Sequence, residues 1–298
     1  MIAVIGPTTA GKSELAVDLA LALGGEVVNG DSMQIYRGMD IGTAKLTDGE
    51  RRGVPHHLLD LLHVGQPVTV AEFQGWARET ISDCRRRGVA PILTGGSALY
   101  VRAVLDEFHF PGTDADVRRR WEAELAIAGP ARLHQRLQAV DPAAAEAILP
   151  SNGRRLVRAL EVVEITGGPY RARLPEHEHA FDGVVQVGLR VPRSDLDGRI
   201  ETRVRRMWAA GLVEEVRVLE AEGLREGRTA SRALGYAQVL RFLAGDCTED
   251  EALAATVAGT RRFARRQDSW FRRDPRTQWL SYDDPDRLER ALAVVRRF

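Results

Sequence analysis

One segment near the N-terminus has the spacing G-x-x-x-x-G-K-[ST] of a phosphate-binding loop. It consists of Gly6, Pro7, Thr8, Thr9, Ala10, Gly11, Lys12 and Ser13. The glycines let backbone N–H groups converge on phosphate oxygens, and the following helix N-terminus and Lys12 add positive potential. The Ser13 hydroxyl suits Mg²⁺. Because the chain has only two lysines, Lys12 and Lys45, the motif is improbable as background.

The loop alone leaves the phosphate chemistry open. Kinases and ATPases, which bind ATP at such a loop, normally add an apolar strand that ends in an aspartate to hold the metal. The candidate strand here runs instead into Thr94, Gly95, Gly96 and Ser97. Hydrolysis is therefore not indicated, and the loop can equally stabilise a departing pyrophosphate. Ser97 either donates to a phosphate oxygen or caps a helix.

A polar segment, residues 31–45, follows the second predicted strand at the end where parallel sheets bind ligands. Asp31 is a candidate general base, with a helix N-cap as the alternative. Gln34 lies in the same polar segment. Lys45 either reaches a second phosphate or is solvated.

Short apolar runs alternate with helical patterns in most of the chain, which predicts a parallel sheet with helices on both sides. Strands are predicted at residues 2–5, 26–29, 91–96, 184–191 and 278–283. The exception is residues 111–181, where helical segments follow one another. The expected fold class is α/β: a P-loop NTPase-like core at residues 1–110 and 182–298, with a helical insertion domain at residues 111–181.

Two arginine clusters stand out against balanced totals of 42 basic and 42 acidic residues. A helix over residues 154–164 places its arginines opposite its leucines. Residues 261–276 contain seven arginines and two aspartates, bordered by Phe263 and Trp270. Both faces suit contacts with nucleic-acid phosphates and stacking on bases. The alternatives are a solvated face in the first helix, and salt bridges with core aromatics in the second.

The composition excludes other classes of protein. A chain of 298 residues with 44% hydrophobic and 28% charged residues buries a core and is too apolar to be disordered. Two cysteines cannot build a disulfide framework, which favours a reducing cytoplasm. No stretch approaches the roughly 18 apolar residues of a membrane span, so we expect no membrane association. His56, His57 and His63 resemble a metal cluster only in composition, and a structural role is favoured.

The order of the motifs resembles that of the tRNA dimethylallyltransferase family nearly end to end. The motifs are GPTTAGKS, DSMQIYRGMDIGTAK, VPHHLLD, VAEFQ, GGSALY, RRLVRALEV, ALGY and RRQDSWFR. The resemblance implies transfer of a dimethylallyl group from dimethylallyl diphosphate to the exocyclic N6 amine of the adenine 3′ of the anticodon in tRNA, with release of diphosphate. It implies that Asp31 accepts the amine proton and that Ser97 assists at the bridging phosphate oxygen. Residues Gly6 to Ser13 would hold the diphosphate, with Mg²⁺ on Ser13.

The resemblance also implies which residues contact the anticodon stem-loop. They are Asp31, Ser32, Met33, Gln34, Ser97, Arg118, Arg154, Arg155, Arg158, Arg232, Gly235, Tyr236, Arg265, Arg266, Gln267, Trp270 and Arg272. The helical insertion is thus expected to bind tRNA. The chain departs from the family at Ser97-Ala98, where Thr-Gly is usual, and serine lacks the methyl that fixes the threonine rotamer.

Three other functions stay open on the sequence. They are a small-molecule or nucleotide kinase, prenylation of a free adenine nucleotide, and an RNA-binding module switched by a nucleotide. Two arginine faces favour a polymeric substrate over that of a kinase. A monomer without an obligate protein partner is expected.

Overall fold

The computed structural model describes residues 1–170 and 177–297. Six strands form one parallel sheet in the order β3-β2-β4-β1-β5-β6. The strands are β1 (Ile2–Ile5), β2 (Glu26–Asn29), β3 (His56–His57), β4 (Pro91–Gly95), β5 (Val185–Arg190) and β6 (Thr277–Ser281). The α/β fold class and the parallel sheet are thus confirmed. Strand β3 has only two residues and was not predicted.

The sheet separates two hydrophobic cores, because successive side chains of a strand point to opposite faces. Ala3 and Ile5 of β1 belong to one core. Ile2 and Val4 belong to the other. The first core is completed by helices α3 (Val70–Arg86), α4 (Ala98–Leu105), α9 (Leu212–Ala221) and α10 (Tyr236–Leu243). The second is completed by α1 (Lys12–Leu23), α8 (Arg193–Ala209) and α12 (Arg287–Val295).

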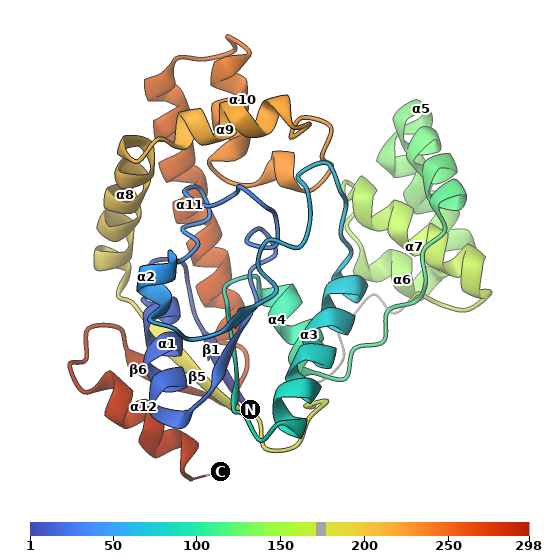
Figure 1. Cartoon of the computed structure of the whole chain (residues 1–298). Coiled ribbons are helices and arrows are strands. Elements are labelled where there is room, and N and C mark those ends of the chain that lie inside the picture. The colour runs from blue at the N-terminus through green and yellow to red at the C-terminus, as the bar shows by residue number, and fades with distance from the viewer. Residues whose placement is uncertain (171–176, 298) are drawn as a thin grey trace. The chain divides into compact units, whose positions relative to one another are not determined.

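Local sequence signals set the bounds of several helices. Helix α3 begins with the expected capping box, in which Thr69 accepts the Glu72 backbone N–H and Glu72 accepts that of Thr69. The long helix α11 (Glu249–Phe271) begins with an equivalent box at Thr248. Two further elements are short: α2 (Asp48–Arg51) and the 3₁₀ turn η1 (Ala230–Arg232). Helices α8 to α11, gold to red in Figure 1, lie together.

The chain divides into two compact units. One comprises Met1–Asp106 and His179–Phe298, and the other is Glu107–Glu178. The boundaries therefore fall after residues 106 and 178, where the sequence suggested 110 and 181. The second unit contains α5 (Ala115–Val140), α6 (Pro142–Ala147) and α7 (Gly153–Thr166), and its described residues form no strand.

The second unit has its own hydrophobic core. Leu133 and Leu137 of α5 pack with Leu156 and Leu160 of α7. Helix α6 begins as expected, with Asp141 as N-cap and Pro142 in the first helical position. Helix α7 is amphipathic, and it shares a core with the part of α5 that follows a kink at Gly129. Across the described residues of the whole chain, none of the helices is both long and apolar enough to cross a membrane.

Candidate active site

Three loops meet at the carboxyl ends of neighbouring strands. Strand β4 pairs with β1 on one side and with β2 on the other, with Gly95 beside Ile5 and Thr94 beside Asn29. The phosphate loop after β1, the Asp31 segment after β2 and the Ser97 loop after β4 are therefore neighbours. The last two approach closely, since a Cβ on Gly95 would lie 2.4 Å from the Gly30 carbonyl carbon. This is the edge at which open parallel sheets bind ligands.

The phosphate loop has the expected strand-loop-helix context. It leaves β1 at Gly6 and enters α1 at Lys12, with Gly11 in the left-handed region at a φ of 87°. The Lys12 ammonium donates to the Pro7 carbonyl at 2.7 Å. The hydroxyl of Thr9 is buried and has no hydrogen-bond partner among the described residues. A phosphate oxygen would satisfy this hydroxyl.

Three charged side chains interact at this edge: Lys12, Asp31 and Arg203 of α8. Burial, together with the Arg203 charge, lowers the pKa of Lys12 to about 7, although Asp31 opposes the shift. Burial raises the pKa of Asp31 above its ordinary value, against a backbone hydrogen bond from Met33 and the charges of Lys12 and Arg203. Burial also lowers the pKa of Arg203. Arg203 and the protonated form of Lys12 together carry more positive charge than the single Asp31 carboxylate balances, which suits a diphosphate.

Asp31 is held by local hydrogen bonds. Its backbone N–H donates to the Asn29 side-chain oxygen at 2.9 Å, and its carboxylate Oδ1 accepts the Met33 backbone N–H at 2.9 Å. Asn29 also donates to the Leu58 carbonyl. The carboxylate is half-buried and caps a turn of loop rather than a helix. One oxygen is used in this turn, so the other is free to accept a proton from a substrate.

Ser97 lies beside Ser32 of the Asp31 segment. The two hydroxyl oxygens are 3.2 Å apart, and the Ser32 backbone N–H donates to Ser97 Oγ at 3.3 Å. Ser97 is the N-cap residue of α4, but its side chain makes no capping hydrogen bond. The helix-capping alternative is therefore wrong for this hydroxyl. Ser97 joins the second and third loops of the site.

Two polar residues of the 31–45 segment, Gln34 and Lys45, bind other groups of the protein. Gln34 donates to the Thr43 carbonyl at 3.2 Å, and Arg203 donates to the same carbonyl at 3.3 Å. Lys45 is buried and binds the carboxylates of Asp40 and Asp60 at 2.6 and 2.5 Å. Lys45 thus neither reaches a phosphate nor is solvated. Both sequence-based alternatives for this lysine are wrong, because the fold turns the lysine inward to two acids of its own neighbourhood.

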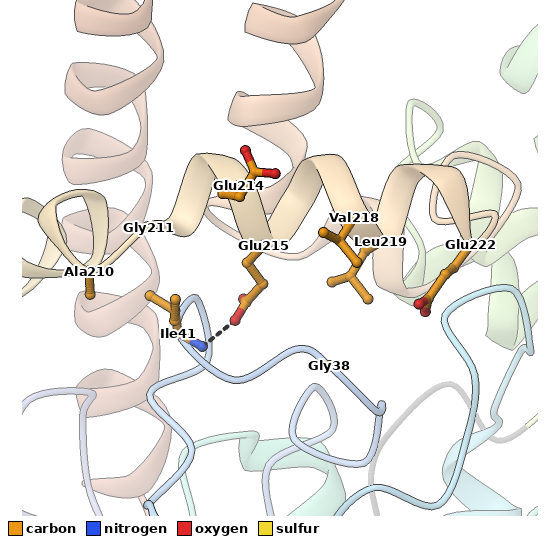
Figure 2. Close-up of a pocket in the computed structure, with 9 residues that line it drawn as sticks. All are labelled: Gly38, Ile41, Ala210, Gly211, Glu214, Glu215, Val218, Leu219 and Glu222. Atoms are coloured by element: carbon orange, nitrogen blue, oxygen red, sulfur yellow. Dashed lines mark hydrogen bonds between the residues drawn. The ribbon is translucent and has the colours of Figure 1, made fainter.

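Glu215 of α9 anchors the same segment. Its carboxylate accepts the backbone N–H groups of Asp40, Ile41 and Gly42 at 3.1, 2.6 and 3.1 Å. Figure 2 shows Glu215 reaching from the helix to the Ile41 nitrogen. It also accepts the Tyr236 hydroxyl at 2.5 Å. Ile41 and Glu215 line a cavity of about 400 Å³, whose three glutamates make it unsuited to an anion.

The ALGY motif lies largely inside the fold. Tyr236 is fully buried and belongs to the first core, and its contact with tRNA stays a prediction. Gly235 is also buried, and its backbone N–H donates to Gln238. Arg232 is exposed and stays a predicted RNA contact.

Gln267 is buried as well. The residue is only 4% exposed, and both ends of its amide bond to the protein: Oε1 accepts the Thr8 backbone N–H and Nε2 donates to the Gly96 carbonyl. These bonds give the amide a role within the protein, and its contact with tRNA stays a prediction. Ser32 and Met33 of the predicted set are buried and half-buried, with Met33 packed against the first core.

The arginines of α11 and of the segment directly after it separate into two groups. Arg261 and Arg272 bind Glu201 and Asp268, and Arg276 beyond the helix binds Asp106 and Asp274. The other group is exposed and has no carboxylate partner in the part of the chain that is described; it consists of Arg262, Arg265, Arg266 and Arg273. Trp270 is half-buried against the first core. The exposed arginine face of residues 261–276 is therefore smaller than predicted. The salt-bridge alternative holds for Arg261, Arg272 and Arg276.

The insertion shows a similar division. The Glu161 carboxylate is fully buried and binds Arg118 at 2.7 Å and Arg158 at 3.0 Å. Arg158 also donates to the Pro111 and Gly112 carbonyls. Burial acts to raise the pKa of Glu161, but hydrogen bonds from Thr113 and the two arginines outweigh it and lower the pKa. Arg118 and Arg158 thus stabilise this unit, while Arg154 and Arg155 are exposed.

One histidine belongs to a group with possible metal ligands. Ligand atoms of Glu26, His57 and Cys84 lie within 4.8 Å of one another. Arg87, however, binds both oxygens of Glu26, and His57 Nε2 donates to the same carboxylate at 2.7 Å. The arginine already neutralises the carboxylate. The favoured structural role of His57 agrees with this network.

Sequence reasoning missed three residues of the site: Asn29, Arg203 and Glu215. Asn29 ends β2, and a polar residue at the end of a buried strand is a usable signal. Arg203 and Glu215 lie more than 150 residues from the loops they contact. Only the tertiary fold brings them to the site.

Fold and site together define an α/β protein with a phosphate-binding loop, a neighbouring carboxylate and exposed arginines. Comparison with known proteins narrows this class. The family model described as IPP transferase matches residues 34–274. The chain belongs to this family.

Close relatives carry one name. The chain is 63% identical to the tRNA dimethylallyltransferase of Thermobifida fusca over 99% of this chain and 94% of that protein. It is 63% identical to the tRNA dimethylallyltransferase of Streptomyces coelicolor over 100% and 96% of the two chains.

Two solved structures are also similar. The tRNA isopentenylpyrophosphate transferase of Bacillus halodurans has a TM-score of 0.72 at 38% identity, covering 99% of this chain and 96% of the other. A eukaryotic dimethylallyltransferase acting on tRNA has a TM-score of 0.87 at 25% identity, covering 100% and 79%.

Proposed function

We propose that the protein is a tRNA dimethylallyltransferase that moves a dimethylallyl group from dimethylallyl diphosphate to the exocyclic N6 amine of the adenine 3′ of the anticodon, releasing diphosphate. The observation that carries the proposal is the meeting of the phosphate loop, Asp31 and Ser97 at one edge of the sheet. Relatives of 61–63% identity that span the chain support it by their name.

The chemistry must begin at the leaving group. An exocyclic amine conjugated with a purine is a weak nucleophile, so the allylic carbon–oxygen bond breaks largely before the nitrogen attacks. The bonding pair of electrons stays on the diphosphate oxygen. Lys12, the loop N–H groups and Arg203 stabilise this growing charge, and each preorganised donor of this kind contributes about 10²- to 10³-fold in rate. Ser97 donates its hydroxyl to the bridging oxygen.

The nitrogen then bonds to the allylic carbon and becomes acidic. Asp31 accepts its proton through the carboxylate oxygen that does not bind Met33. Burial shifts the pKa of Asp31 toward neutral pH, and this shift makes the carboxylate a stronger proton acceptor. Atoms and charge balance: one carbon–oxygen bond is lost, one carbon–nitrogen bond forms, and the proton leaves on Asp31.

Mg²⁺ fits this site as a partner of the substrate. In proteins it is often bound by one or two side chains plus substrate phosphates and water. The Ser13 hydroxyl supplies such a ligand, and the unsatisfied hydroxyls of Thr9 and Thr94 are further polar groups at the same strand ends. When bound, the ion would neutralise charge on the diphosphate.

Exposed arginines would bind the RNA. The free arginines of α11 in the first unit and Arg154 and Arg155 in the insertion would contact phosphates. The target base must leave its stack to reach Asp31, as enzymes acting on bases generally require. We also place the protein in the cytoplasm, which suits its free cysteines, Cys84 and Cys247.

The test is incubation of the protein with dimethylallyl diphosphate, Mg²⁺ and unmodified tRNA, followed by nuclease digestion and mass spectrometry. The expected product is adenosine with one added dimethylallyl group, with one pyrophosphate released for each group transferred. Omission of tRNA and replacement by free adenine nucleotide are the controls. Phosphorylation of an added acceptor from ATP, without prenylated adenosine, would favour the kinase alternative.

A further inference from the structure

Gln267 of α11 connects two loops of the active site. Its Oε1 accepts the Thr8 backbone N–H at 2.9 Å, and its Nε2 donates to the Gly96 carbonyl at 2.7 Å. Thr8 belongs to the phosphate loop, and Gly96 immediately precedes Ser97. These loops follow neighbouring strands, yet the amide of a third element spans them.

The space around this amide is fully used. A Cβ on Gly96 would lie 2.3 Å from Gln267 Nε2 and 3.6 Å from Lys12 Nζ. Gln267 is 4% exposed. A buried amide with both ends bonded has one orientation, because rotation by 180° would set donor against donor and acceptor against acceptor.

The bonds also determine what the loop can offer a phosphate. The Thr8 N–H is occupied by Gln267, so it is not one of the N–H groups that face a ligand. The bond instead fixes the Pro7–Thr8 peptide, whose carbonyl oxygen accepts the Lys12 ammonium at 2.7 Å, one residue before Thr9 with its buried and unsatisfied hydroxyl. At the other loop, the bond to the Gly96 carbonyl orients the peptide that leads into Ser97.

We propose that Gln267 is a positioning residue that fixes the spacing between the phosphate loop and Ser97. The inference rests on the proposed function and deepens it. The two loops must bind one diphosphate together, with Lys12 and Ser13 on the outer phosphate oxygens and Ser97 on the bridging oxygen. An error of about 1 Å in such a spacing can cost about 10²-fold in rate.

The first test is Gln267→Met, which keeps the volume and removes both hydrogen bonds. We expect the affinity for Mg²⁺-pyrophosphate, measured by calorimetry without RNA, to fall about tenfold and kcat to fall about 10- to 100-fold. Affinity for the anticodon stem-loop and its salt dependence should not change. The matched control is Arg266→Ala on the same helix, which should weaken RNA binding and leave pyrophosphate binding intact.

Two results would overturn the inference. One is unchanged pyrophosphate affinity and kcat in Gln267→Met. The other is a loss confined to RNA affinity, which would show Gln267 to be an RNA contact. Since the pyrophosphate titration needs neither RNA nor turnover, it reports on Gln267 even if the wild-type protein fails to prenylate tRNA and the proposed function is wrong.

A pH profile separates positioning from simple filling of space. In Gln267→Glu the carboxyl can still accept from Thr8, but it donates to the Gly96 carbonyl only when protonated. Its kcat/KM relative to the wild type should therefore rise as the pH falls from about 8 to 6, since burial raises carboxyl pKa values. A ratio that is flat with pH would contradict the inference.

A second pair of variants guards against a folding defect in Gln267→Met. Gly96→Ala should displace the amide and lower pyrophosphate affinity by itself. In a Gln267→Ala background the same change should add little, because the group with which the new methyl collides is gone. Fully additive losses would show that the two residues do not act together.

Discussion

The Glu215 carboxylate accepts the Tyr236 hydroxyl at 2.5 Å while it holds three successive backbone N–H groups of the Asp40–Gly42 turn. Next to this turn, the Thr43 carbonyl accepts Gln34 and Arg203. The half-buried Glu215 and the buried Tyr236 thus hold the segment to which Gln34 and Arg203 bind.

We expect Glu215→Gln to lower the free energy of unfolding by about 1–3 kcal/mol, because an amide cannot accept at both ends and its NH₂ group faces a backbone donor. Turnover should also fall, by about tenfold, as the Arg203 contact loosens. Denaturant unfolding and steady-state rates check both effects. Tyr236→Phe is the matched control: it should cost about 1 kcal/mol and leave tRNA affinity unaltered. A selective loss of tRNA affinity in Tyr236→Phe would contradict the burial of this residue.

Lys12 should take up a proton when the donor binds. Its pKa of about 7 in the free protein means that it is mostly neutral at pH 8, and a bound diphosphate raises that pKa. Uptake should approach about one proton at pH 8, and donor affinity should fall about tenfold per pH unit above 7. Calorimetry in two buffers of different ionisation enthalpy measures the uptake. If the uptake persists in Lys12→Met, the proton belongs to another group.

The pH profile of kcat/KM should show a rising limb that belongs to Asp31. Since burial raises the pKa of this carboxyl, kcat/KM rises only as the pH passes above the ordinary aspartate range, and it declines again as Lys12 of the free protein loses its proton. Asp31→Asn should reduce kcat by about 10²-fold or more and abolish the rising limb. Stem-loop affinity is the control and should be retained. A full rate in Asp31→Asn would remove this residue from proton transfer.

The exposed arginines of α11 should govern the salt dependence of RNA binding. Replacing Arg265 and Arg266 by alanine should reduce the slope of log K against log[salt] by about 0.7–0.9 per lost phosphate contact. Arg217→Ala is the control, because Arg217 is exposed but paired with Glu214. Fluorescence anisotropy with a labelled stem-loop at several salt concentrations provides the slopes. Equal slopes in all three proteins would mean that the face is only solvated.

Much of the fold could be predicted because its signals are local. The glycines and lysine of the phosphate loop, the Thr69 capping box and the strand at 184–191 each depend on a few neighbouring residues. Strand β3 consists only of His56–His57, so it is too short to show the alternation of apolar and polar residues typical of a strand. It forms because it pairs with the edge of β2. The sequence pattern thus predicts an element correctly where neighbouring residues alone determine its structure.

The site was predictable in part. Asp31 and Ser97 follow strand ends, so their place could be inferred from the sheet. Whether an arginine faces RNA or a buried acid depends on a partner that is distant in sequence, as Glu161 shows for Arg118 and Arg158. A motif match likewise does not indicate exposure, which is why the burial of Tyr236 and Gln267 could not be predicted.

The most direct test of the central claim is a crystal structure with a non-reactive thiolodiphosphate analogue of the donor and an anticodon stem-loop. The claim predicts the diphosphate in the Gly6–Ser13 loop and the adenine N6 at about 3 Å from the Asp31 carboxylate. Phosphates bound elsewhere, or an Asp31 side chain turned away from N6, would contradict it.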